Sequence, residues 1–214
     1  MAGHLIPGSA FFLLTAFIWF LCRAAQNQSS SSSTLQSAQR RLPVAYGMFL
    51  CISTSIGLLA EMIDSHGSQS DSWMDHISLS KEHCTMYLAF LITGIAALLE
   101  SKGRCRPHSW RLFLAASFSV EGFLFYMHSL MQHDMDHSMT EALLHWILAI
   151  ISFVAAGSFA LSVANAEQAL EWTVFASAFA LLEGVWFYFV AWSMYSGVYG
   201  DAAMMMDVGA VGSF

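Results

Sequence analysis

Two glutamates lie in the middle of apolar stretches and are followed by the same residues. The segments VEGFLFY at 120–126 and LEGVWFY at 182–188 share the pattern Glu-Gly-x-x-Phe-Tyr around Glu121 and Glu183. An ionisable side chain inside a bilayer costs at least about 2.5–3.5 kcal/mol on insertion scales, so each one needs a reason to be there. The glycine after each glutamate lets a neighbouring helix approach closely. The pattern predicts two packed helices whose carboxyl groups face inward near the bilayer midplane.

A second set of ionisable residues recurs at one end of the apolar stretches. It consists of His4, Glu61, His83, His128 and His145. Each lies near the same end of a different predicted helix, so folding of the helices into a bundle is expected to gather them. Glu121 and His128 are seven residues apart, which is two helical turns along one face. We expect Glu121 to lie below the histidines on a shared inner face.

Neutral imidazoles together with carboxylates suit a transition metal, and inward-facing ligands from several helices are how helix bundles build such sites. We therefore expect a site for Zn, Fe or Cu formed by the five residues above. A bound metal brings the pKa of its water toward neutrality, which enables hydrolytic or oxidative attack. In this hypothesis Glu121 is the catalytic general base or instead orients a metal ligand, and the substrate is a lipid-like molecule that enters from the bilayer.

Six apolar stretches must position these residues, because a helix that crosses the hydrocarbon core needs about 20 mostly apolar residues. The stretches are 5–22, 42–63, 83–100, 110–131, 142–164 and 171–195. Continuous apolar runs without two-residue alternation favour helices over a barrel. The sequence predicts an all-α fold, in which residues 1–195 form one transmembrane helical bundle.

The composition excludes several other classes of protein. Of the 214 residues 57% are hydrophobic and 11% charged, whereas a soluble domain has roughly 25% charged residues. The net charge of −7 and the lack of a Lys/Arg stripe exclude a nucleic-acid partner. The partner that the composition predicts is the lipid bilayer, and the sequence says nothing about protein partners.

The basic residues predict the orientation of the bundle. Seven of the eight Lys and Arg residues flank the first and third loops, and the opposite face has only Lys81. The positive-inside rule places those two loops in the cytosol. The N-terminus is then expected on the lumenal or extracellular side.

Two segments are expected to lie outside the bundle. Residues 26–39 are rich in serine, with too little apolar surface to fold, and we expect a disordered loop there. The tail at 196–214 is rich in glycine and interrupted by Asp201 and Asp207. We expect a truncated or rudimentary seventh span in that tail.

Several blocks of the sequence resemble one family. They are GHLIPGSAFF at the start, EHCTMYLAF in the third stretch, VEGFLFYMHS in the fourth, LLHWILAI in the fifth and LLEGVWFYFVAW in the sixth. In this order and over residues 3–195, they resemble the transmembrane protein 45 family.

The resemblance implies a multi-pass protein of secretory, endosomal or plasma membranes, with seven spans and a lumenal or extracellular N-terminus. It carries no assigned activity. The positions that match the family's motifs include His4, Glu61, His83, Glu121, His128 and His145. Here Glu82 precedes His83, where relatives can have paired histidines, and the chain ends where the seventh span is expected.

Two further hypotheses compete with the metal site. In the first, the protein is a non-catalytic membrane scaffold or trafficking protein, whose buried polar side chains fix helix packing at roughly 0.6 kcal/mol per contact. In the second, it transports protons or a metal ion past Glu121 and Glu183. The cytosolic halves of the stretches offer few polar residues for such a path.

Overall fold

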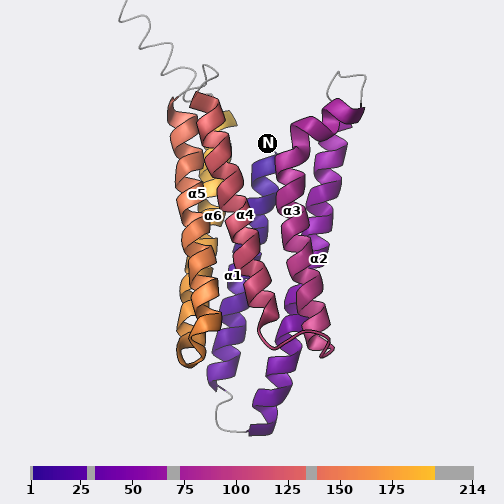
Figure 1. The fold of residues 1–214 in the computed structure, drawn as a ribbon, viewed down its shortest axis with the longest axis vertical. Helices are drawn as coiled ribbons and strands as arrows, with labels where there is room; N and C mark the ends of the chain where they lie inside the picture. Colours follow the sequence, from indigo (N-terminus) through magenta and orange to yellow (C-terminus); the bar gives the residue numbers. More distant parts are fainter. Residues whose placement is uncertain (1, 28–31, 67–72, 134–138, 196–214) are drawn as a thin grey trace, which may run out of the picture.

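Six long helices make up the described part of the chain (Figure 1). The computed structural model describes residues 2–27, 32–66, 73–133 and 139–195. The helices are α1 (Ala2–Asn27), α2 (Ser32–His66), α3 (Trp73–Ser101), α4 (Ser109–His133), α5 (Met139–Ala164) and α6 (Ala169–Tyr195). A short 3₁₀ turn, η1 (Ala166–Gln168), joins the last two. The described residues confirm the predicted all-α fold.

The helices run up and down and pack most extensively as three pairs, which are α2 with α3, α4 with α5, and α1 with α6. The first and last of the described helices are therefore neighbours. The packing of α5 on α6 and of α3 on α4 joins the pairs, while α1 packs less closely on α2. Phenylalanines from five helices fill the centre, where Phe118 and Phe159 are fully buried.

Four of the helices are long and apolar enough to cross a membrane. Their candidate spans are Pro43–Ile63, Lys81–Ser101, Ala142–Ala164 and Ala169–Ser193. The shorter apolar segment Ile6–Ala16 lies in α1. In α4, serines and ionisable residues interrupt the apolar run. The structure thus supports an integral membrane bundle with four spans of this kind, and the predicted six spans stay a prediction.

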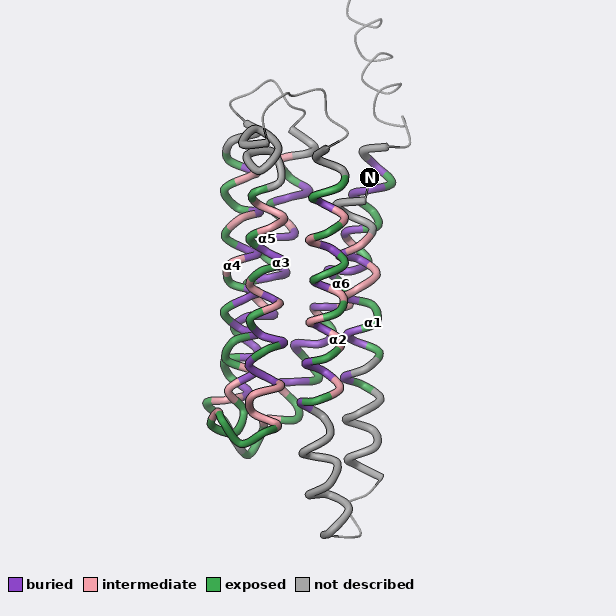
Figure 2. Tube along the Cα trace, turned by 90° about the vertical axis from the view of Figure 1, so that its right-hand side faces the viewer, coloured by how far each residue is buried: buried purple, intermediate pink, exposed green. Residues whose placement is uncertain are grey.

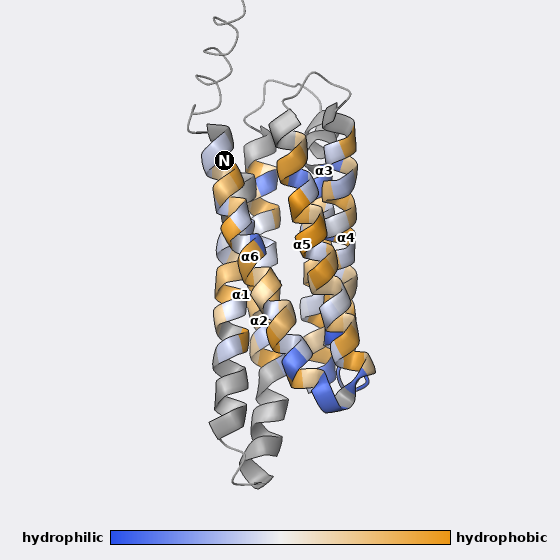
Figure 3. Cartoon of the chain, turned by 90° about the vertical axis from the view of Figure 1, so that its left-hand side faces the viewer, coloured by the Kyte–Doolittle hydropathy of each residue, from blue (hydrophilic) through white to orange (hydrophobic). Residues whose placement is uncertain are grey.

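Large apolar side chains point outward along the bundle, which is the reverse of what a water-soluble bundle shows. Ile63 is 72% exposed and Leu13 60% exposed, and many similar residues follow the outer faces (Figures 2 and 3). Hydrophilic residues gather at the turn between α3 and α4. This distribution fits a bundle whose outer surface contacts lipid.

Three helix contacts depend on glycine. A Cβ atom at Gly47 of α2 would lie 2.7 Å from the Gly94 carbonyl oxygen of α3. One at Gly184 of α6 would lie 3.0 Å from the Gly8 oxygen of α1, and one at Gly122 of α4 would lie 3.2 Å from the Ala149 oxygen of α5. Each glycine therefore lets two backbones approach closely, and a side chain at any of the three positions would be tightly packed against the neighbouring helix.

The predicted loop at 26–39 is wrong over most of its length. Helix α1 continues to Asn27, and α2 begins at Ser32. Residues 35–40 are Leu, Gln, Ser, Ala, Gln and Arg, most of which favour a helix, and extending an existing helix costs far less than starting one. The predicted seventh span at 196–214 lies outside the described residues.

The turn between α3 and α4 is held by its own hydrogen bonds. Gly103, at φ 68°, ends α3 with bonds from its N–H to the Glu100 oxygen (2.8 Å) and from the Arg104 N–H to the Leu99 oxygen (2.9 Å). The Glu100 carboxylate accepts from the backbone N–H of His108 at 2.8 Å and caps the start of α4. Burial, and after it the charge of Arg111, lowers the pKa of His108, against the opposite effect of Glu100.

Candidate functional site

The two central glutamates are fully buried and differ in their hydrogen bonding. Glu121 comes from α4 and Glu183 from α6, and the carboxyl groups are close enough to interact electrostatically. The Ser152 hydroxyl of α5 donates a hydrogen bond to Oε1 of Glu183. Neither carboxyl oxygen of Glu121 has a hydrogen-bond partner among the described residues. A buried polar group without a partner is rare and calls for an explanation.

The predicted packing of these two helices is partly wrong. Both carboxyl groups face inward as expected, but the most extensive neighbours of α4 and α6 are α5 and α1, respectively. Gly122 lies against α5, and Gly184 lies against α1. The two segments meet through Phe125 and Phe187, whose ring centroids are 5.6 Å apart. The two glycines therefore lie at two different interfaces, that of α4 with α5 and that of α6 with α1.

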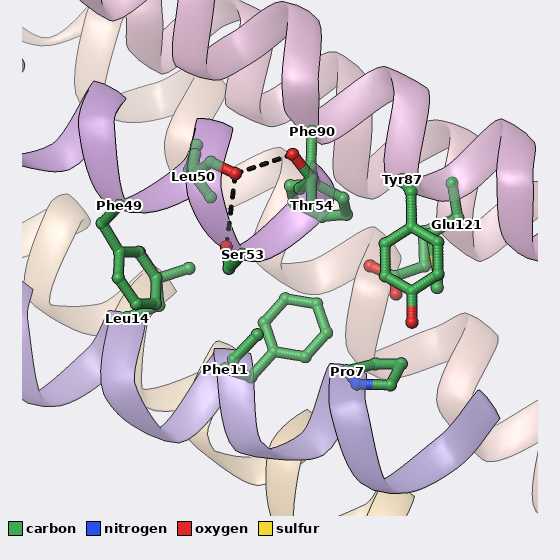
Figure 4. Close-up of a pocket in the computed structure, with 12 residues that line it drawn as sticks. Pro7, Phe11, Leu14, Phe49, Leu50, Ser53, Thr54, Tyr87, Phe90 and Glu121 are labelled. Atoms are coloured by element: carbon green, nitrogen blue, oxygen red, sulfur yellow. Dashed lines mark hydrogen bonds between the residues drawn. The ribbon is translucent and has the colours of Figure 1, made fainter. Parts of the chain in front are cut away.

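The carboxyl group of Glu121 lies beside a cavity between α1, α2 and α3 (Figure 4). The space open to the centre of a water molecule is about 30 Å³, which is enough for a water-sized group. Its walls are largely apolar. The lining residues are Pro7, Ala10, Phe11, Leu14, Phe49, Leu50, Ser53, Thr54, Met86, Tyr87, Phe90 and Glu121.

Other polar groups of the cavity wall differ in how far they are already bonded. The hydroxyls of Ser53 and Thr54 both donate to the Leu50 carbonyl oxygen, at 3.2 and 2.7 Å. The Tyr87 hydroxyl is buried and has no hydrogen-bond partner in the described part of the chain. Tyr87 is also within electrostatic range of Glu121 and Glu61. The unbonded polar atoms of the wall therefore belong to Glu121 and Tyr87.

An aromatic cluster forms the wall around this cavity. The Phe11 ring stacks on Phe118 (centroids 5.6 Å apart) and on Phe187 (5.9 Å), and its edge meets Phe90 at 5.7 Å. Interlocked rings of this kind contribute about 0.5–1.5 kcal/mol per pair beyond the burial of their area. Phe11 thus joins α1 to α3, α4 and α6 and fixes the shape of the cavity.

The histidines and carboxylates gather at the end of the bundle where α2 ends and α3 begins, which we call the histidine end. The His83 Nδ1 atom of α3 lies 3.3 Å from Oε1 of Glu61 in α2. The His128 Nδ1 atom of α4 lies 3.0 Å from Oε2 of Glu82 in α3. The rings of His128 and His145 pack with centroids 4.6 Å apart. The histidine end therefore links α2 to α3, α3 to α4, and α4 to α5.

The structure brings four of the five predicted metal ligands into two pairs, Glu61 with His83 and His128 with His145. Over residues 2–27, 32–66, 73–133 and 139–195, no group of three or more His, Cys, Asp or Glu side chains is arranged to hold a metal ion. The side chain of His4, the fifth predicted ligand, lies outside those that are described. The metal site remains a prediction.

Three residues of this region were not predicted as site residues. Glu82 pairs with His128, Ser152 bonds to Glu183, and Tyr87 shares the cavity wall with Glu121. Glu82 had a signal in the sequence, since it lies directly beside His83 at the start of an apolar stretch. Ser152 and Tyr87 had none, because a serine or tyrosine within a span is usually bonded to its own helix or faces the interface.

Residues 108–204 are similar to a protein family that is described as a family of unknown function, DUF716. The matched segment includes all of α4, α5 and α6, and with them Glu121, His128, His145 and Glu183. Helices α1, α2 and α3, which supply most of the cavity wall, precede it.

Proposed function

We propose that this integral membrane protein belongs to the transmembrane protein 45 group and performs acid–base chemistry on a lipid-like molecule within the bilayer. Glu121 is the proton-accepting residue in this proposal. The match of residues 108–204 to a family of unknown function supplies no activity, so the proposal rests on the chemistry of the site.

One observation carries the proposal. Both carboxyl oxygens of Glu121 are buried, have no hydrogen-bond partner among the described residues, and lie beside an apolar cavity. A carboxyl group that only fixed helix packing would be bonded to a neighbouring helix, as Glu183 is bonded to Ser152. An ionisable residue inside a membrane bundle is by default a candidate functional residue.

The histidine end supplies a second part of the proposal. His4, Glu61, His83, His128 and His145 would bind Zn, Fe or Cu, with imidazoles as the principal ligands. The contact of His83 with Glu61 supports this set, because it brings two of the five residues together at the histidine end. Glu82, which is not one of the five, lies beside His128, and a carboxylate that accepts from one ring nitrogen would orient the other toward a metal.

The metal is tested by mass spectrometry of the purified full chain in detergent, without chelators. We expect near-stoichiometric Zn, Fe or Cu that is lost in His83→Ala and His128→Ala. A folded wild-type protein without metal would remove the metal from the proposal. His108→Ala, which changes an exposed histidine of the α3–α4 turn, is the matched control.

The role of Glu121 is tested with lipid extracts as substrates. Wild-type protein is incubated with fractionated lipids, and the products are compared by mass spectrometry with those of Glu121→Gln and Glu171→Gln. We expect product formation that Glu121→Gln abolishes and Glu171→Gln preserves, because Glu171 is exposed in the first turn of α6. Product formation by Glu121→Gln at the wild-type rate would contradict the proposal.

A second candidate function, a membrane scaffold, is favoured by the other polar side chains. Thr93 and Ser117 share a hydrogen bond of 2.8 Å between α3 and α4, and Thr15 donates to the Ser177 oxygen at 3.1 Å between α1 and α6. Such bonds need no chemistry to explain them. A scaffold would show graded losses of stability on mutation and neither metal nor products.

A further inference from the structure

The cavity beside Glu121 has an acidic residue in its wall and no cationic side chain among its described lining residues. Glu121 contributes a buried carboxyl group to its wall, and the carboxyl group of Glu183 lies within electrostatic range. None of the described residues that line the cavity is Lys, Arg or His. A buried charge is stable only when it is paired and hydrogen-bonded. A cationic or donor-rich ligand would supply the partner that the described lining residues do not provide.

The hydrogen-bonding groups of the wall also indicate which kind of ligand head group the cavity would bind. Within the described part of the chain, neither oxygen of Glu121 has a hydrogen-bond partner, and neither does the Tyr87 hydroxyl beside them. An ammonium group has three N–H donors and no acceptor, so it matches a site with several acceptor atoms. A neutral alcohol has a single donor, and an anionic head group would be repelled by the two carboxyl groups.

The cavity is large enough for a small head group but too small for a hydrocarbon chain. About 30 Å³ accommodates a group the size of water or ammonium but not a hydrocarbon tail. The rest of an amphiphile must extend between helices, and α1 packs on α2 less closely than on α6. Leu13 of α1 and Ile52 of α2 are 60% and 57% exposed and provide apolar surface on those two helices.

We propose that this cavity binds the head group of a single-chain amphiphile that carries a primary ammonium group, with Glu121 and Tyr87 as its hydrogen-bond acceptors and the chain leaving between α1 and α2. The inference rests on the proposed function for its choice of a lipid-like ligand. It adds the chemical class of the head group and the place where that group binds.

The test uses the full chain in nanodiscs of phosphatidylcholine and a long-chain primary amine that carries a photoreactive group. Labelling is measured against competition by unlabelled dodecylamine or dodecanol, which have the same chain and different head groups. The labelled peptides are then identified by mass spectrometry. We expect the labelled peptides to come from α1 and α2. Dodecylamine should compete at a concentration about tenfold or more lower than dodecanol, because a hydrogen bond to a charged group contributes at least as much free energy as a tenfold change in affinity requires.

Two variants assign the binding to the cavity. Glu121→Gln removes the negative charge with little change of shape, and we expect the affinity for dodecylamine to fall by about tenfold or more. Ser53→Phe fills the cavity from the opposite wall and should reduce labelling to background. Glu171→Gln, the matched control, should bind as the wild-type protein does. Circular dichroism and gel filtration check that each variant is folded.

Three outcomes would overturn the inference. They are unchanged binding in Glu121→Gln, equal competition by the amine and the alcohol, and labelling confined to helices that do not line the cavity. Metal analysis and product formation are measured on the same samples. Amine binding without metal or turnover would contradict the proposed function and support this inference. Turnover of a lipid that lacks an amine would support the proposed function and contradict this inference.

Discussion

The segments 120–126 and 182–188 have the same pattern and nearly the same burial, yet they make different bonds. In each, the glutamate is fully buried, the glycine touches another helix, and the phenylalanine enters the aromatic core. Glu183 is bonded to Ser152, whereas Glu121 lies beside a cavity with neither oxygen bonded in the described chain. The pattern therefore sets the position of a carboxyl group, and the neighbouring helix decides whether it is structural or available to a ligand.

We expect the largest change in the free energy of unfolding when Gly122 or Gly184 is replaced by alanine. Alanine at position 184 would place its Cβ 3.0 Å from the Gly8 backbone oxygen, and alanine at 122 would place it 3.1 Å from the Phe153 ring. We expect Gly184→Ala to lower the free energy of unfolding by about 1–3 kcal/mol. Gly122→Ala should cost less, because the nearest backbone oxygen there, that of Ala149, would lie 3.2 Å from the added Cβ and the Phe153 ring can rotate away.

The measurement is reversible unfolding of the protein by sodium dodecyl sulfate in mixed micelles. Gly157→Ala is the control, since its Cβ would meet no atom within 4 Å. Alanine there should be neutral or stabilise the helix by up to about 1 kcal/mol. Equal stability of all three variants would mean that the two segments do not depend on close helix contacts.

Replacing each glutamate by leucine sharpens the contrast. Glu183→Leu removes the acceptor of the Ser152 hydrogen bond and should cost about 1–3 kcal/mol. Glu121→Leu removes a buried polar group that has no hydrogen-bond partner among the described residues and should leave stability unchanged or raise it. The same unfolding experiment measures both, and equal losses in the two variants would contradict the contrast.

A smaller effect is expected from Ser152→Ala. The Ser152 hydroxyl also contacts the Leu148 oxygen at 2.9 Å, so part of its bonding lies within α5. We expect a loss of about 1 kcal/mol in the wild-type protein and in Glu121→Leu, and a smaller loss in Glu183→Leu. A double-mutant cycle measures this coupling. Coupling of the serine to Glu121 rather than to Glu183 would reverse the assignment of the two carboxyl groups.

We expect the smallest difference in stability between variants of Tyr126 and Tyr188, the tyrosines at the ends of the two segments. The Tyr188 hydroxyl shares a hydrogen bond of 2.6 Å with Ser9 of α1. Since this bond is partly exposed, Tyr188→Phe should cost only about 0.5 kcal/mol, at the low end for a hydrogen bond. Tyr126→Phe should change stability less than that. Thermal unfolding in detergent compares them, and a larger loss for Tyr126→Phe would be the contrary result.

The sequence was sufficient to predict the helices and the inward carboxyl groups, because both follow from long apolar runs and from the cost of an ionisable group in lipid. It was not sufficient to predict that Gly122 and Gly184 contact α5 and α1, since spacing along one helix does not identify its neighbours. The His83–Glu61 contact was within reach, as both residues lie near the same predicted end. The cavity could not be predicted, because it depends on how α1 packs against α2, α3 and α4.

The contact between α1 and α6 has a consequence for how the protein is made. The first helix emerges from the ribosome long before the helix on which it packs most closely. Gly8, Phe11 and Thr15 then lack their partners on α6 until α6 itself has been synthesised. A chain that stops before α6 would leave this face of α1 uncovered. Packing of α1 on α6 thus makes the synthesis of α6 a condition for assembly of this part of the bundle.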